Sequence, residues 1–298
     1  MNPVAVKIAH ISDLHLSGWL DRRQISAFDR LLEHFTIEGF DHIVISGDLS
    51  NGASTADWKI VKDALARHGL YHWEKATVVA GNHDLTNLEE EMRFYNALNP
   101  FPAFRMTTFR KKLAEFCSFF SELITGNGSP SFPFIKVLNY PPLSLAIVAV
   151  NSVHPWFPAD NPLGARGEIS SGQLRALVQP DVLDSLKERF VIGLCHHAYR
   201  VYGTDALIDQ AFDWTMELKN RDEFLNTMKL ISAQLVLHGH FHRFQTYMAD
   251  GIPFVNGGSF RYDVRRYCRL DIEGKGNFSQ KFAFLPEKEK GGRSRLTA

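Results

Sequence analysis

The sequence predicts an α/β fold, and two features of the chain lead to this prediction. Short apolar runs with the character of buried strands alternate with segments whose apolar residues recur at helical spacing. Polar residues also follow the end of each of the first three predicted strands. Because α/β sheets bind their ligands at the carboxyl ends of strands, these polar residues are the first candidates for a functional site.

The composition is that of an ordinary globular enzyme. The chain has 298 residues, of which 45% are hydrophobic and 22% are charged, which is enough to bury a core. Lysine plus arginine equals aspartate plus glutamate, at 33 each, so no net positive field is available to hold nucleic acid. We therefore expect no stable complex with nucleic acid.

Three cysteines without close pairs indicate a reducing compartment rather than a disulfide framework or a cysteine-based zinc site. The first strand begins at about Val4, which leaves no room for a signal peptide. The longest apolar run, Leu145–Val150, is far too short to span a membrane. We therefore expect a cytoplasmic protein without a membrane span. The oligomeric state stays open, a homo-oligomer included.

The first predicted strand covers residues 4–11, in which apolar side chains alternate with smaller or polar ones. It leads into Asp13 and His15, which are two residues apart. In extended backbone such residues project to the same side. An oxygen ligand and a nitrogen ligand are therefore expected to point together at the mouth of the sheet.

The second and third predicted strands also end in polar residues. Residues 41–46 form a short apolar strand that closes on Gly47-Asp48, where the glycine permits a tight turn. Residues 76–80 form a third strand, which runs directly into Gly81-Asn82-His83-Asp84. Each of the three strands is thus followed, at its carboxyl end, by side chains that can bind a metal ion.

Helices are predicted between these strands. Residues 21–36 carry apolar side chains at helical spacing and form an amphipathic helix. Ser54 is an N-cap residue for the next helix, and Gly69 lies just past the end of that helix. Thr86 and Glu89 form a capping box for a further helix.

The alternation breaks over residues 87–136, which hold nine of the 23 phenylalanines. Apolar residues of this stretch fall on one helical face, namely Phe109, Leu113, Phe116, Phe120 and Leu123. We predict an inserted helical cap beside the site. Its aromatic side chains either pack the small core of the insertion itself, or form a lid or an apolar substrate pocket.

The second half of the chain repeats the pattern of strands that end in polar residues. Strands are predicted at 145–150, 190–194 and 235–237, followed in turn by Asn151-Ser152, Cys195-His196-His197 and His238-Gly239-His240-Phe241-His242. Helices are predicted from Ser170, with Gln173 in its first turn, and over 221–232. A further strand and a glycine turn lie near 254–259, and the chain beyond about Pro286 is charged and frayed.

The polar residues at the strand ends are carboxylates, imidazoles and one carboxamide. They are Asp13, His15, Asp48, Asn82, His83, His196, His197, His240 and His242. Such oxygen and nitrogen ligands suit Mn, Fe, Zn, Co or Ni. Even seven ligands from this set are too many for one ion, but they divide over two ions if one carboxylate bridges, as in centres that cleave phosphate esters. Lone histidines elsewhere are interpreted as surface residues, namely His34, His68 and His72.

The order of these motifs resembles the calcineurin-like metallophosphoesterase superfamily, and within it the small phosphodiesterase branch of cyclic-nucleotide and glycerophosphodiester phosphodiesterases. The resemblance is carried by Asp13-Leu14-His15, Gly47-Asp48, Gly81-Asn82-His83-Asp84, His196 and Gly239-His240-Phe241-His242, with further similarity over Gly167–Leu174. The resemblance spans roughly residues 5–260 and leaves out the insertion and the tail. We therefore expect one metallophosphoesterase domain over residues 1–285, with the cap insertion at about 87–136, and a flexible tail at 286–298. Ala198 stands where this branch often has proline, so both His196 and His197 stay open as the ligand.

The resemblance also implies a four-layer αββα sandwich, in which helices flank two mixed β-sheets. Two metal ions are implied, the first bound by Asp13, His15, Asp48 and His242, the second by Asp48, Asn82, His196 and His240. Asp48 would bridge the ions. A metal-bridging hydroxide would attack phosphorus, and His83 would contact the phosphate or protonate the leaving group. His83 and Asp48 are therefore the expected catalytic residues.

The leading hypothesis is a binuclear-metal phosphodiesterase that acts on small phosphodiesters. A phosphomonoesterase stays open, as does a DNA-repair nuclease, whose family shares Ile-Ser-Asp-Leu-His and Gly-Asn-His-Asp, although the neutral charge argues against it. A non-catalytic scaffold is a third alternative. Scaffolds of this fold usually lose the reactive histidine or several ligands, whereas this chain retains His83 and every expected ligand.

Overall fold

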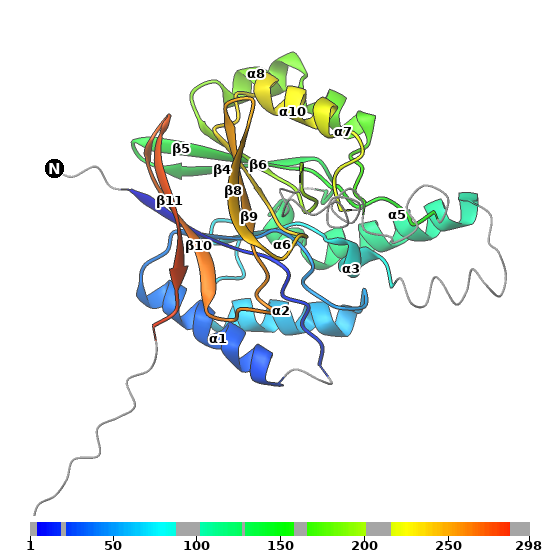
Figure 1. The fold of residues 1–298 in the computed structure, drawn as a ribbon, viewed down its shortest axis with the longest axis vertical. Helices are drawn as coiled ribbons and strands as arrows, with labels where there is room; N and C mark the ends of the chain where they lie inside the picture. Colours follow the sequence, from blue (N-terminus) through cyan, green and yellow to red (C-terminus); the bar gives the residue numbers. More distant parts are fainter. Residues whose placement is uncertain are drawn as a thin grey trace, which may run out of the picture.

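The computed structural model describes residues 5–18, 22–87, 102–126, 129–157, 166–200 and 216–286. Two mixed β-sheets stack on each other, and helices cover the outer face of each sheet (Figure 1). This arrangement confirms the predicted four-layer α/β sandwich. Within the described ranges, no helix combines the length and the apolar character that crossing a membrane requires.

The first sheet has five strands in the order β11-β10-β1-β2-β3. Its strands are β1 (Val6–Ile11), β2 (His42–Ile45), β3 (Ala76–Val78), β10 (Arg266–Gly274) and β11 (Asn277–Phe284). The first three are parallel, whereas β10 runs antiparallel to β1 and to β11. Two helices cover the outer face of this sheet (Figure 1), α1 (Arg22–Ile37) and α2 (Thr55–Arg67).

The second sheet has six strands in the order β4-β5-β6-β7-β9-β8. Its strands are β4 (Phe134–Tyr140), β5 (Leu143–Ala149), β6 (Phe190–Leu194), β7 (Leu235–His238), β8 (Phe244–Ala249) and β9 (Ile252–Gly257). Strands β5, β6, β7 and β9 are parallel, and β4 and β8 are antiparallel edges. Three helices lie over this sheet (Figure 1), α7 (Ser171–Leu177), α8 (Pro180–Leu186) and α10 (Arg221–Leu230).

Strand β5 shows that the second sheet is buried on both faces. Leu145 and Ile147 belong to the core that includes the first sheet, α1 and α2. Ala146 and Val148 instead belong to the core beneath α7 and α10. Because successive strand residues point to opposite faces, a continuous apolar run is what a strand covered on both sides requires. Each fully buried aliphatic side chain contributes about 1.5–3 kcal/mol to stability.

Two aromatic residues of the predicted cap, Phe116 and Phe120, belong to the main core. They lie on α5 (Pro102–Phe119) and just before α6 (Ser121–Ile124). The rings of Phe116 and Phe120 are fully buried, with centroids 5.3 and 6.2 Å from that of Trp58 on α2. The expectation that these aromatics pack a separate core within the insertion is therefore wrong. Residues 134–136, which the predicted cap included, form the start of β4.

A buried lysine fixes α6 to the first sheet. The Nζ of Lys136, on β4, donates to the carbonyls of Trp73, Ala76 and Leu123 at 2.9, 2.7 and 2.7 Å. Lys136 is fully buried, and its Nζ lies 4.4 Å from the centre of the Trp73 ring. Three carbonyl acceptors match the three N–H donors of an ammonium group, so the buried charge is hydrogen-bonded on every donor.

Strands β4, β8, β10 and β11 lie where the sequence predicted no strand. On β10, charged residues such as Arg269 and Asp271 alternate with buried Leu270 and Ile272, so no continuous apolar run marks the strand. The helix expected after Thr86 lies outside the described residues, as do residue 4 of the first predicted strand and the tail beyond residue 286.

Candidate metal centre

Polar side chains that follow β1, β2, β3, β6 and β7 converge at one edge of the sandwich. These strands are parallel within their sheets, so their carboxyl ends face the same way. Two groups of side chains there offer ligand atoms that all lie within 4.8 Å of one another. The first group is Asp13, His15, Asp48 and His242, and the second is Asp48, His196 and His240.

The backbone around the centre is not extended. Asp13 and His15 have φ angles of 54° and 46°, in the left-handed region, so the sequence-based reason for their convergence is wrong. Asp48, His240 and His242 also have positive φ. Five of the eight non-glycine residues with positive φ in the described part of the chain thus lie in the two groups. Such conformations each cost about 1–3 kcal/mol and commonly mark functional sites.

The first group is compact. Nε2 of His242 lies 3.0 Å from Oδ1 of Asp13 and 3.3 Å from Nε2 of His15. Nε2 of His15 in turn lies 3.6 Å from Oδ2 of Asp48. The second oxygen of Asp13 accepts a hydrogen bond from the backbone N–H of His240 at 3.0 Å. Asp13 thereby links the loops after β1 and β7.

The second group shares Asp48 with the first. Nε2 of His196 lies 3.5 Å from Oδ2 of Asp48 and 3.2 Å from Nδ1 of His240. Oδ1 of Asn82 lies 3.2 Å from the same His196 nitrogen, so the carboxamide faces this group. Of the adjacent pair His196 and His197, only His196 contributes a ligand atom to the group.

Glycine permits the close approach that brings Asp48 to its position. A Cβ on Gly81 would lie 2.1 Å from Oδ1 of Asp48, which no side chain could tolerate. Gly47 has φ of +103°, and a Cβ there would lie 2.4 Å from the His196 ring. The glycines of the Gly-Asp and Gly-Asn-His-Asp motifs are therefore required by contact with the centre.

The donor set fits metal ions. Asp13 and Asp48 are at most 1% exposed, and their ionic partners among the described residues are histidines only. Burying a carboxylate costs several kcal/mol unless a cation compensates it. Two carboxylates with converging imidazoles and one carboxamide make an oxygen and nitrogen set of the kind that first-row divalent ions prefer.

The electrostatics of the groups agree with this role. Burial would raise the pKa of the Asp48 carboxyl, but His196 and His83 hold that pKa well below its usual range. Burial lowers the pKa of His240 to about 3, so its imidazole is neutral and keeps a free lone pair. Against the effect of burial, Asp48 raises the pKa of His196 to about 9. Without a metal, the proton of the second group resides on His196, beside the shared carboxylate.

His83 lies beside the groups but belongs to neither. It is on the short helix α3 (Asn82–Leu85), and its ring centroid lies 4.8 Å from that of His15. Its Nδ1 donates to the carbonyl of Asn51 at 3.2 Å, which leaves Nε2 for another partner. An imidazole in this position can donate to, or accept from, a group bound at the centre.

Two buried side chains without a predicted role hold the centre together. Asp84 accepts from the backbone N–H groups of Gly81, Leu49 and Ser50, at 3.0, 3.1 and 2.8 Å. It thereby joins the loops after β2 and β3. The feature of the sequence that marks Asp84 is its place in the Gly-Asn-His-Asp motif.

Ser152 has a similar role on the second sheet. Its Oγ accepts from the backbone N–H groups of His196 and His197, at 3.2 and 3.1 Å. The hydroxyl then donates to Nδ1 of His197 at 2.9 Å. His197 is fully buried, with its ring centroid 4.4 Å from that of His240. Only its position after a predicted strand marked Ser152 in the sequence.

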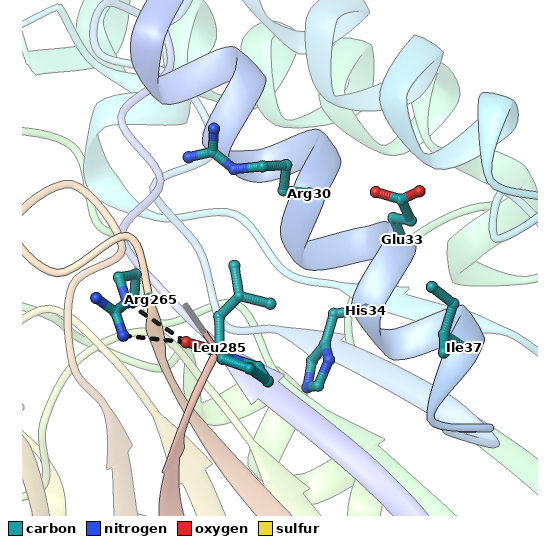
Figure 2. Close-up of a pocket in the computed structure, with 7 residues that line it drawn as sticks. Arg30, Glu33, His34, Ile37, Arg265 and Leu285 are labelled. Atoms are coloured by element: carbon teal, nitrogen blue, oxygen red, sulfur yellow. Dashed lines mark hydrogen bonds between the residues drawn. The ribbon is translucent and has the colours of Figure 1, made fainter. Parts of the chain in front are cut away.

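Three other histidines and a further cavity lie apart from the groups. His34, His68 and His72 belong to neither group, in agreement with their sequence interpretation. A cavity of about 500 Å³ lies between α1 and the end of β11 (Figure 2). It is lined by Arg30, Glu33, His34, Ile37, Arg265, Leu285 and Pro286. Since none of these residues belongs to the groups, the cavity is separate from the candidate centre.

Comparisons with known proteins agree with the fold. No curated protein matches the sequence. Among solved structures, GAP50, described as the anchor in the inner membrane complex of Plasmodium, has a TM-score of 0.55 at 12% identity, covering 94% of this chain and 85% of that chain. A dimetal phosphatase from Danio rerio has a TM-score of 0.52 at 14% identity, with coverage of 93% and 98%. TT1561 of Thermus thermophilus has a TM-score of 0.51 at 14% identity, with the same coverage.

The fold and the two groups define an α/β sandwich protein with a candidate binuclear metal centre. A profile of the calcineurin-like phosphoesterase family matches residues 6–244, which is most of the chain. The chain therefore belongs to the calcineurin-like phosphoesterase family, as the sequence motifs predicted. The solved structures are all below 25% identity, so their likeness concerns the fold alone.

Proposed function

We propose that this protein is a two-metal phosphodiesterase that hydrolyses small phosphodiesters. The observation that carries the proposal is the sharing of Asp48 between the two groups, each of which contains histidines. A carboxylate shared in this way is suited to bridge two ions, and binuclear centres of this kind cleave phosphate esters. Family membership supports the reaction class.

In this proposal Asp13, His15, Asp48 and His242 bind the first ion. The second ion is bound by Asp48, Asn82, His196 and His240. When bound, the two ions would supply an activated water and neutralise charge on the phosphoryl oxygens. Asn82 contributes a neutral oxygen, which keeps the centre positive enough to attract an anionic substrate. The choice among Mn, Fe, Zn, Co and Ni is left to experiment.

His83 is the proposed general acid, which protonates the leaving group. Its Nδ1 is committed to the Asn51 carbonyl at 3.2 Å, so a proton on Nε2 is the one available to a leaving alkoxide. The backbone N–H of His83 is fixed on Asp48 at 2.9 Å, which positions the imidazole relative to the metal ligands. Positioning of this kind is what general acid catalysis requires.

The approach to the site favours small substrates. A cavity of about 300 Å³ separates α5 from the loop behind His83, lined by Gly52, Ala53, Leu85, Asn87, Thr108, Lys111, Lys112 and Glu115. The backbone N–H of Ala53, which lines this cavity, donates to the carbonyl of His83 at 2.7 Å, so the wall of the cavity is joined to the backbone of the proposed acid. We propose that α5, as part of the cap, narrows access and disfavours polymers. The balanced charge of 33 basic and 33 acidic residues also argues against a nuclease.

The test is hydrolysis of bis(4-nitrophenyl) phosphate and 4-nitrophenyl phosphate by the full chain, each assayed with Mn, Fe, Zn, Co and Ni. We expect a higher kcat/KM for the diester, loss of activity on chelation and recovery on return of the metal. Preference for the monoester would support the phosphomonoesterase alternative instead. Absence of hydrolysis with every ion would contradict an enzymatic role and support a scaffold.

A further inference from the structure

The turn after β9 carries two side chains to the rim of the candidate metal centre. Its backbone is fixed on the loop that holds the first metal group, because the N–H groups of Phe260 and Arg261 donate to the carbonyls of Ser12 and Asp13. These hydrogen bonds measure 3.0 and 3.2 Å. Phe260 is 1% exposed and anchors the turn in the core. The next two residues, Arg261 and Tyr262, are therefore held in fixed positions.

Tyr262 exposes an aromatic ring beside the centre. Its ring centroid lies 5.3 Å from that of His242, with the planes tilted by 57°. The residue is nevertheless 72% exposed. Phe284 is also exposed and aromatic, but its ring lies against the guanidinium of Arg266, at 5.4 Å, instead of against a residue of the metal groups. An aromatic ring that is carried by an anchored turn and stays open to solvent is a ready stacking surface.

Arg261 places a guanidinium group near His83, because both residues are hydrogen-bonded to Asn51. Its Nη1 donates to Oδ1 of Asn51 at 3.0 Å, and the carbonyl of the same Asn51 accepts from Nδ1 of His83. Among the described residues, Arg261 has no carboxylate within ion-pair distance. Its remaining N–H donors are suited to a phosphate oxygen, which guanidinium groups bind in bidentate fashion.

We infer that Arg261 and Tyr262 form a substrate subsite, in which Tyr262 stacks on a planar ring such as a nucleobase and Arg261 binds the phosphate. The inference rests on the proposed function and narrows its substrate class to esters that carry a flat aromatic group. An aliphatic ester would leave the Tyr262 ring unpaired, whereas a nucleotide ester would cover it. Stacking of a base on an aromatic side chain is sequence-tolerant, so the subsite selects for a ring rather than for one particular base.

The test compares two diesters that differ only in the base, the methyl esters of adenosine 5′-phosphate and of ribose 5-phosphate. Methanol is the leaving group in both, so the chemical step is matched. We expect the wild-type enzyme to have a KM about tenfold lower for the adenosine ester, with similar kcat. Tyr262→Phe should keep this preference, and Tyr262→Leu should abolish it by raising KM for the adenosine ester alone.

Matched variants separate the two side chains. Arg261→Gln should raise KM for both esters about tenfold, because the lost contact is to the phosphate that both share. Phe284→Leu is the control, since it removes an exposed aromatic ring that belongs to neither metal group. It should leave the KM values for both esters unchanged. Equal KM values for the two esters in the wild-type enzyme would overturn the inference. An equal effect of Tyr262→Leu on both esters would also overturn it.

A binding measurement keeps the subsite separate from the proposed reaction. Equilibrium dialysis of metal-loaded His83→Ala protein should give a Kd about tenfold lower for adenosine 5′-monophosphate than for ribose 5-phosphate. Adding Tyr262→Leu should make the two Kd values equal. A chain that hydrolyses no ester but shows this Tyr262-dependent difference would refute the proposed function and retain the subsite. Equal Kd values before the Tyr262 change would overturn the subsite whatever the activity.

Discussion

The backbone N–H of His83 donates a 2.9 Å hydrogen bond to Oδ1 of Asp48. The other oxygen of that carboxylate, Oδ2, lies 3.6 Å from Nε2 of His15 and 3.5 Å from Nε2 of His196, one from each metal group. Asp48 thus uses one oxygen to fix the peptide of the proposed acid and the other to face both groups. The acid and the centre are positioned by the same carboxylate, so displacement of Asp48 would disturb both.

Replacement of His83 by alanine removes the proposed acid but keeps the backbone contact to Asp48. The backbone N–H remains, so Asp48 keeps its partner and both ions should stay bound. We expect kcat for diesters with poor leaving groups to fall about 100- to 10,000-fold, the usual contribution of general acid catalysis. The loss should be smaller with a nitrophenolate leaving group, which needs little protonation. Steady-state kinetics with elemental analysis of the variant checks both statements.

His72→Ala is the matched control, since His72 is exposed and belongs to neither group. It should leave kcat unchanged. If His83→Ala protein instead contains fewer metal ions than the wild type, His83 is a ligand and its assignment as acid is wrong.

Ser152→Ala should weaken the second metal group. The serine hydroxyl accepts from the N–H groups of His196 and His197, so its loss frees the backbone that carries His196. Outer-shell partners of metal ligands typically contribute 10- to 100-fold in affinity, and we expect about tenfold weaker binding of the second ion. The first ion should bind as before. Titration calorimetry of apo protein with Mn measures the two affinities, and Ser144→Ala on β5 serves as control. Unchanged affinity for the second ion would refute this role.

Stability of the apo protein should fall with acidification. Burial, and then the charge of Lys136, lowers the pKa of His42 to about 3. The unfolded chain therefore binds more protons than the folded one between the folded pKa and the usual 6.5, so stability is complete above 6.5 and is lost as pH falls below it. For His42 alone the loss between pH 7.5 and 5.5 is about 1.4 kcal/mol.

Urea unfolding of apo wild-type and His42→Gln proteins at the two pH values checks this prediction. Glutamine keeps hydrogen-bonding capacity toward Glu74 and Thr77 but cannot titrate. Between pH 7.5 and 5.5, the variant should lose about 1.4 kcal/mol less of its free energy of unfolding than the wild type does. An identical pH dependence in both proteins would show that His42 does not contribute.

The sequence predicted that polar residues at several strand ends lie close together, and the physical reason is clear. Parallel strands place their carboxyl ends at one edge, and continuous apolar runs such as those of β5 and β6 mark strands buried on both faces. Polar residues directly after such runs are therefore expected to lie close together at that edge. The family motifs then gave the assignments of His196 and Asn82, which spacing alone left open.

Other features depend on contacts that no local pattern contains. The left-handed backbone of Asp13 and His15 is set by hydrogen bonds of the Asp13 and His15 N–H groups to the Gly47 and Asp48 carbonyls of the neighbouring loop. Strand β10 pairs with β1 across nearly the whole chain, with His10 opposite Cys268. A charged residue such as Lys136 is ordinarily a surface residue, and only the three carbonyls around it explain its burial.

Lys136→Met should destabilise the fold. Burial lowers the pKa of Lys136 to about 6, whereas the three surrounding carbonyls favour the ammonium form. Methionine fills similar space but leaves those carbonyls without their donor, so we expect a loss of about 3 kcal/mol or more in the free energy of unfolding. Urea denaturation measures it. Lys111→Met, an exposed change on α5, should alter stability by less than about 0.5 kcal/mol. A Lys136→Met protein as stable as the wild type would contradict the structural role of this lysine.

Metal stoichiometry tests most directly whether Asp48 joins two metal ions in one centre. Equilibrium dialysis of the apo chain against Mn, followed by elemental analysis, should give two ions per wild-type chain at saturation. In Asp48→Asn the shared anionic ligand is lost, so both sites should weaken and activity should fall about a thousandfold or more. Asp63→Asn, on α2 and outside both groups, should keep two ions. One ion per chain at saturation in a fully active wild-type enzyme, or two tightly bound ions in Asp48→Asn, would contradict the account.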